Sequence, residues 1–99
     1  MNDELKAQLH RYFERQEFYE ATRAILRLNV MADDVSDELL DSFEPAMRCR
    51  IFHLLRVWCK DGTRAILERR AKTETDEECK RSIAVLLLTF GGLKSDAIA

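Results

Sequence analysis

The scarcity of residues that interrupt a helix limits what this chain can fold into. Its 99 residues include one proline and three glycines, and no segment alternates apolar and polar positions as a half-buried strand does. Hydrophobic residues make up 46% of the chain and charged residues 34%, a balance typical of a globular domain. A chain of this length forms a single core. We therefore expect an all-α fold, a compact bundle of five to six helices.

Two segments set the expected architecture. Apolar residues at helical spacing predict an N-terminal helical hairpin over residues 1–29, with a turn near Gln16–Glu17. Pro45 suits the first turn of a later helix, which we expect to run to about Lys60. The apolar residues of that helix occur on nearly all of its sides, which is typical of a buried element. The hairpin is therefore expected to pack on a central apolar helix.

Three hydroxyl residues are candidates for helix starts. Ser36 is a plausible N-cap for a short helix within the connector at residues 33–44. Thr63 can cap a fifth helix after the break at Asp61-Gly62. Thr75 is followed three residues later by Glu78, which predicts a capping box at the start of the last helix.

The end of the last helix is expected at Gly91-Gly92, because glycine readily adopts the left-handed conformation that ends a helix. Residues 1–92 are then a single helical domain, and residues 93–99 are a frayed tail. An N-terminal signal peptide is not expected, because charged residues interrupt the first sixteen positions. The longest apolar run has six residues, far fewer than the roughly 20 that span a bilayer. We expect a cytoplasmic protein, or a nuclear one in a eukaryote, without a membrane partner.

The three cysteines do not indicate a disulfide framework. Cys49, Cys59 and Cys79 are an odd number within helical apolar patterns, so we interpret them as reduced core thiols. Cys49 and His53 are four residues apart on one helix, a spacing at which two side chains can share a metal. No CxxC or HxxxH pair accompanies them, and a core thiol beside a partly exposed histidine is the favoured interpretation. We expect no metal.

No enzyme motif occurs in the chain. It lacks a GxSxG elbow, a phosphate-binding glycine loop, a dinucleotide fingerprint and an HExxH pair. Carboxylates are plentiful, but they occur in runs without a surrounding cleft motif, so no acid–base pair can be nominated. The sequence therefore predicts a protein that is not an enzyme and needs no cofactor.

The net charge of −2 conceals two oppositely charged segments. Residues 33–44 carry six acidic and no basic residues, whereas residues 46–72 carry eight basic and two acidic ones. Neighbouring helix faces of opposite charge can simply attract one another, which is the favoured interpretation. Alternatively, a helix-turn-helix could present the basic segment to nucleic-acid phosphates, through Arg64, Arg69, Arg70 and Lys72. A third possibility is that the acidic segment contacts a basic groove on another protein, through Asp33, Asp34, Asp37, Glu38 and Asp41.

The segment from Leu9 to Ile25 resembles the LisH motif, a short helix-turn-helix dimerisation element. The matching positions are Leu9, Tyr12, Phe13, Phe18 and Ile25; Ala21-Thr22 has the motif's Thr-Ala pair in reverse order, and Glu17 occupies the place of its turn glycine. The resemblance implies a homodimer in which two hairpins form a four-helix bundle, with Phe13 and Phe18 near the seam. The same side chains could instead pack on the central helix of their own chain.

We therefore expect a non-catalytic protein–protein interaction module, such as an adaptor, an inhibitor or an assembly subunit. It is expected to be regulatory and to form a homodimer through the N-terminal hairpin. The predicted contact residues are Leu9, Tyr12, Phe13 and Phe18 of the hairpin and the acidic residues Asp33, Asp34, Asp37, Glu38 and Asp41. The alternative is a small helix-turn-helix-like nucleic-acid-binding regulator that uses the basic residues of 48–72.

Overall fold

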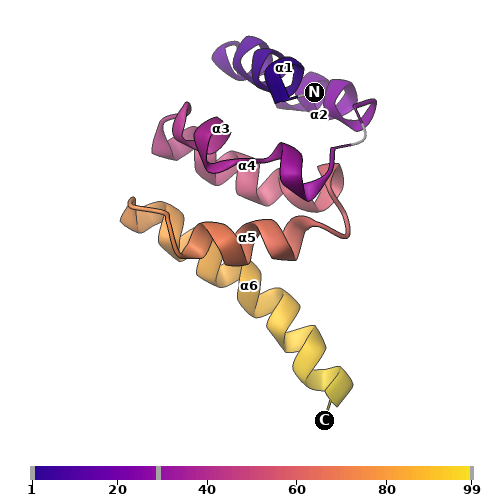
Figure 1. The fold of residues 1–99 in the computed structure, drawn as a ribbon, viewed down its shortest axis with the longest axis vertical. Coiled ribbons are helices and arrows are strands. Elements are labelled where there is room, and N and C mark those ends of the chain that lie inside the picture. Colours follow the sequence, from indigo (N-terminus) through magenta and orange to yellow (C-terminus); the bar gives the residue numbers. More distant parts are fainter. Residues whose placement is uncertain (1, 29, 99) are drawn as a thin grey trace.

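The chain forms six α-helices and one 3₁₀ turn in the part that the structure describes (Figure 1). The computed structural model describes the backbone of residues 2–28 and 30–98, and the side chains of residues 3–28 and 30–89. The elements are α1 (Asn2–Glu14), α2 (Phe18–Leu26), η1 (Ala32–Asp34), α3 (Asp37–Asp41), α4 (Pro45–Trp58), α5 (Thr63–Ala71) and α6 (Glu77–Ile98). The prediction of an all-α bundle with an N-terminal hairpin is confirmed.

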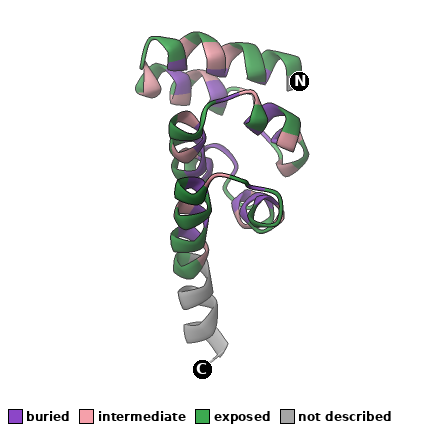
Figure 2. Ribbon diagram, turned by 90° about the vertical axis from the view of Figure 1, so that its left-hand side faces the viewer, coloured by how far each residue is buried: buried purple, intermediate pink, exposed green. Residues whose placement is uncertain are grey.

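The helices are stacked in tiers, with α4 in the middle. Figure 1 shows the α1–α2 hairpin at one end, α3 and α4 next to it, and α5 and α6 beyond them. Helix α4 contacts α2, α5 and α6, so it joins the hairpin to the C-terminal helices. The C-terminal part of α6 extends past the other helices. Figure 2 shows buried residues on the sides of the helices that face one another.

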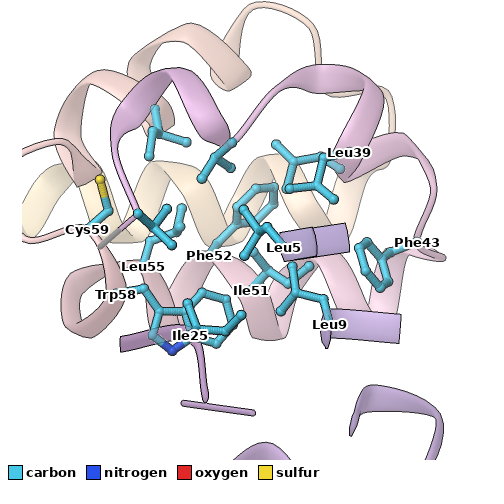
Figure 3. Close-up of a cluster of buried hydrophobic side chains, with 14 of the residues drawn as sticks. Leu5, Leu9, Ile25, Leu39, Phe43, Ile51, Phe52, Leu55, Trp58 and Cys59 are labelled. Atoms are coloured by element: carbon cyan, nitrogen blue, oxygen red, sulfur yellow. The ribbon is translucent and has the colours of Figure 1, made fainter. Parts of the chain in front are cut away.

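The hydrophobic core is built around one side of α4. Ile51, Phe52 and Leu55 of α4 are almost completely buried. Leu5 and Leu9 of α1 pack into the same cluster, together with the residues labelled in Figure 3. The predicted packing of the hairpin on a central apolar helix is confirmed. The helix ends at Trp58, two residues before the predicted end.

A Schellman motif ends α1 and forms the turn of the hairpin. Gln16 adopts a left-handed φ of 56°. The amide of Glu17 donates to the carbonyl of Tyr12 at 2.9 Å, and the amide of Gln16 donates to the carbonyl of Phe13 at 3.0 Å. These two bonds are the pair that defines the motif, in which glycine usually holds the left-handed position. The left-handed residue is therefore Gln16, one position before Glu17.

Two of the three predicted caps are wrong. Ser36 caps α3, because its hydroxyl accepts from the amide of Leu39 at 3.1 Å. The N-cap of α5 is Gly62, and Thr63 instead donates to the carbonyls of Leu55 and Cys59 at the end of α4. The capping box at the start of α6 does not form. That helix is capped by Asp76, whose carboxylate accepts from the amide of Cys79 at 3.0 Å.

The predicted end of the last helix is also wrong. Helix α6 continues through Gly91-Gly92 to Ile98, where we expected the tail at 93–99 to begin after residue 92. No glycine with a positive φ occurs among the described residues, so this pair does not supply the expected left-handed stop. Glycine can occupy a helix interior at a cost of about 1 kcal/mol relative to alanine. The side chains of residues 90–99 lie outside the described part of the chain.

Replacing Gln16 with glycine should stabilise the fold. A left-handed conformation costs a residue with a side chain roughly 1–2 kcal/mol, and glycine avoids this cost but loses more backbone entropy on folding. We expect Gln16→Gly to raise the free energy of unfolding by about 0.5–1 kcal/mol, measured by urea denaturation. Glu17→Gly is the matched control, because Glu17 has a φ of −94° and should gain nothing. A gain for Glu17→Gly that exceeds the gain for Gln16→Gly would contradict this assignment.

Candidate interaction surface

Glu74 is a buried carboxylate in the loop between α5 and α6. Its side chain accepts from Arg48 at 3.1 Å (Nε to Oε1) and at 2.8 Å (Nη2 to Oε2), a bidentate pair across the bundle. Arg70 donates through Nε to Oε1 at 3.0 Å. The backbone amides of Thr75 and Asp76 donate to Oε2 at 3.1 and 3.0 Å. Five donors therefore satisfy a carboxylate that has lost its contact with water.

Arg70 extends this cluster to the acidic segment. Its Nη1 lies 3.2 Å from Oδ1 of Asp37, and its Nη2 lies 2.6 Å from Oδ1 of Asp41. The guanidinium side chain is 1% exposed, whereas the side chains of Asp37 and Asp41 are 36% and 64% exposed. We call Arg48, Arg70, Glu74, Asp37 and Asp41 the Glu74 network. One residue of the basic segment thus pairs with two residues of the acidic segment within the same chain.

The pKa of Glu74 follows from these contacts. Burial by itself would raise the pKa of this carboxyl, but the hydrogen bonds from Arg48, the Asp76 amide and Arg70 lower it to about 2. Burial would lower the pKa of Arg70, and its bonds to Asp41, Glu74 and Asp37 reverse that effect and raise it. Glu74 therefore remains ionised throughout the physiological range.

The residues predicted to bind nucleic acid are largely engaged inside the protein. Arg70 is buried in the Glu74 network, and Arg69 donates to the carbonyl of Val35. The half-buried Arg64 lies 3.7 Å from the Glu68 carboxylate, in a pair on the surface of α5. Lys72 is exposed. These four side chains do not form one basic face that a phosphate backbone could reach.

The hairpin residues predicted at a dimer seam lie mostly within the core. Leu9 and Phe13 are buried, and Phe13 contacts the Trp58 ring at a centroid distance of 6.2 Å. Phe18 is half-buried and packs edge-on against Phe13 at 5.1 Å. Tyr12 is also half-buried at the edge of the core. Leu9 and Phe13 are therefore inaccessible to a partner in this conformation.

The remaining predicted acidic residues have different environments. Asp33 and Glu38 are exposed. The Asp34 carboxylate accepts from the backbone amide of Met31 at 2.9 Å and so stabilises the start of η1. Of the five acidic residues predicted to bind a partner, Asp34, Asp37 and Asp41 therefore interact with groups of their own chain. The described interactions within the fold do not include Asp33 or Glu38.

An apolar groove lies between the end of α2 and the end of α4. It has a volume of about 580 Å³, and we call it the α2–α4 groove; its lining residues are Leu26, Val30, Met31, Ala32, Val57, Trp58, Cys59, Lys60, Asp61 and Gly62. Three large apolar side chains on it are well exposed: Leu26 by 49%, Met31 by 60% and Val57 by 44%. Sequence reasoning missed this surface, because these side chains come from two helices and a connector.

The comparisons with known proteins found no match for this chain. No protein-family model matches the chain, and neither does any curated protein or solved structure. Among the helices that the structure describes, none combines the length and the apolar character that crossing a bilayer requires. The described side chains also contain no group of three or more His, Cys, Asp or Glu residues that could hold a metal ion.

Neutralising Glu74 should destabilise the fold strongly. Glu74→Gln leaves the buried guanidinium groups of Arg48 and Arg70 without their shared counter-charge, and losing one partner of a buried ion pair costs about 3–5 kcal/mol. We expect a loss of this size in the free energy of unfolding, measured by urea denaturation. Glu68→Gln is the control, because its pair with Arg64 is exposed and should contribute less than about 1 kcal/mol. Equal losses for the two variants would contradict the role assigned to Glu74.

The low pKa of Glu74 predicts an acid-sensitive fold. Because the folded pKa of about 2 lies below the value of 4.5 for an unperturbed carboxyl, this group stabilises the fold above pH 4.5. The contribution, about 3 kcal/mol, should be lost progressively as the pH falls from 4.5 to 2. Urea denaturation at intervals over this range measures it. Glu74→Gln should flatten the slope, and an unchanged slope in that variant would show that other groups cause the acid sensitivity.

Proposed function

We propose that this protein is a non-catalytic interaction module, an adaptor or assembly subunit, that forms a homodimer through the α2–α4 groove. The observation that carries the proposal is the clustering of Leu26, Met31 and Val57 around one groove with 44–60% of each residue exposed. Adjoining exposed apolar side chains of this size are typical of protein contact sites. Association would remove them from water, at roughly 25 cal/mol for each Å² of apolar surface.

The hairpin contributes to the proposed interface through the end of α2, and not through the aromatic residues predicted at its seam. Phe13 is buried in the core, whereas Leu26 at the end of α2 is exposed on the surface. The homodimer proposed here therefore uses the end of α2 together with the end of α4, and not the seam at Phe13 and Phe18 that the LisH resemblance implies.

The rim of the groove favours a second copy of the chain as the occupant. Lys60 and Asp61 lie next to each other on the groove, beside its apolar lining. In a two-fold dimer each surface meets its own copy, so Lys60 of one chain can pair with Asp61 of the other, twice. An apolar centre with a polar rim is the usual composition of such an interface. The groove is thus chemically complementary to itself.

The nucleic-acid alternative has less support. Arg69 and Arg70, two of its four predicted contacts, already bond to groups of their own chain. Releasing Arg70 would leave Glu74 short of a cationic partner in the core.

Charged substitutions in the groove should dissociate the dimer. We expect the wild type to sediment as a dimer at ~50 μM, and Leu26→Glu/Val57→Glu to weaken dimerisation at least about 100-fold, because each chain loses two apolar contacts and the interface brings four like charges together. Val85→Glu on α6 is the matched control, because Val85 is 55% exposed and does not line the groove. Analytical ultracentrifugation with circular dichroism separates dissociation from unfolding. A wild type that is monomeric at ~50 μM, or a dimer lost only in Val85→Glu, would overturn the proposal.

A further inference from the structure

Two of the three cysteines lie side by side across the α4–α6 contact. The sulfur atoms of Cys49 on α4 and Cys79 on α6 are 3.4 Å apart. A disulfide needs a sulfur–sulfur distance of about 2.05 Å, so the two atoms must approach by a little over ~1 Å to form a bond. The third cysteine, Cys59, is buried at the end of α4 beside Gly62, whose amide donates to the Cys59 carbonyl at 3.0 Å. The fold therefore pairs two thiols and leaves the third apart.

The two paired thiols differ in their access to solvent. Cys49 is half-buried, whereas Cys79 is 0% exposed. The thiol of Cys79 also lies 3.3 Å from the carbonyl of Pro45, and the Ser82 hydroxyl donates to the Cys49 sulfur at 3.6 Å. A small oxidant from solution would thus meet Cys49 first.

The environment of Cys79 supports the same order of events. Burial, followed by the hydrogen bond and the charge interaction with Cys49, raises the pKa of Cys79 to about 12. Cys79 is therefore a protonated thiol at neutral pH and a poor first target for an oxidant.

We propose that Cys49 and Cys79 are a reversible redox pair that forms an intrachain disulfide when the protein meets a peroxide. The Cys49 thiol loses its proton as its sulfur attacks one peroxide oxygen, the O–O bond breaks, and the leaving hydroxide takes up that proton, so the products are a sulfenic acid and water. The Cys79 sulfur then attacks the Cys49 sulfur, loses its proton and displaces the sulfenic oxygen as a second water. The two thiols lose two electrons and two protons, and the peroxide is reduced to two waters.

The disulfide would fix α6 to the central helix. It would close a loop of about 30 residues that contains the α4–α5 turn, all of α5 and Glu74. A covalent link of this span restricts the unfolded chain, so the oxidised form should be more resistant to heat. A dithiol reductant would reverse the change.

Mass spectrometry of the full chain tests the pair directly. The protein is treated with graded hydrogen peroxide at pH 7.5, alkylated, and analysed intact and as peptides without reduction. We expect a mass loss of about 2 Da, one alkylated cysteine (Cys59), a Cys49–Cys79 peptide pair and a rise in Tm of at least about 5 °C, all reversed by dithiothreitol. Sulfinic acid at Cys49 without a cross-link, a bond to Cys59, or disulfides only between chains would each overturn the proposal.

Three variants assign the roles of the cysteines. Cys59→Ser should form the disulfide as the wild type does, whereas Cys49→Ser should form none. Cys79→Ala should accumulate the Cys49 sulfenic acid, detected as a dimedone adduct at least about fivefold above the wild type. Circular dichroism verifies that each variant is folded. If Cys79→Ala does not fold, the loss of the disulfide in Cys49→Ser still tests the pair, because Cys49 is only half-buried. A disulfide that persists in Cys49→Ser would contradict the assignment.

Discussion

The Glu74 carboxylate lies between the guanidinium groups of Arg48 and Arg70, and the C-terminal part of the fold depends on this contact. Removing a carboxylate from water costs several kcal/mol, which hydrogen bonds and opposite charge must offset. Here the offset comes from two arginines and from two backbone amides of the following loop. Arg48 belongs to α4 and Arg70 to α5, and Asp76 caps α6. One acidic side chain thus fixes three helices relative to one another.

The same contact determines which surface is left for interaction. Arg70 draws Asp37 and Asp41 of α3 onto the C-terminal helices, so part of each charged segment is neutralised within the chain. At the other end of α4, the apolar side chains of Leu26, Met31 and Val57 are exposed to solvent and are not buried in the core. The most distinctive accessible surface is therefore an apolar groove rather than a basic face. This distribution is the basis of the proposed association with protein.

Local patterns predicted the helices, whereas contacts between distant residues determined the site. The scarcity of breakers, Pro45 at a helix start and the Ser36 cap all act within a few residues, and the structure agrees with them. Glu74 was missed because its partner Arg48 is 26 residues away and no motif links the two positions. The failed capping box has a related cause, since the Thr75 amide, which the Glu78 side chain would accept from in such a box, donates to Glu74 instead. Burial of Phe13 likewise depends on packing against Trp58, which the hairpin sequence does not encode.

Hydrogen exchange in wild type and Glu74→Gln, followed amide by amide, tests most directly whether Glu74 organises these elements. Among the described contacts, helix α3 is linked to Glu74 only through Arg70, so it reports on coupling and not on local damage. We predict that protection falls in the variant at Leu40 of α3 as well as at Cys79 of α6, while Leu9 and Ile25 of the hairpin keep more of theirs. A loss confined to residues 74–79, with Leu40 unchanged, would contradict the account.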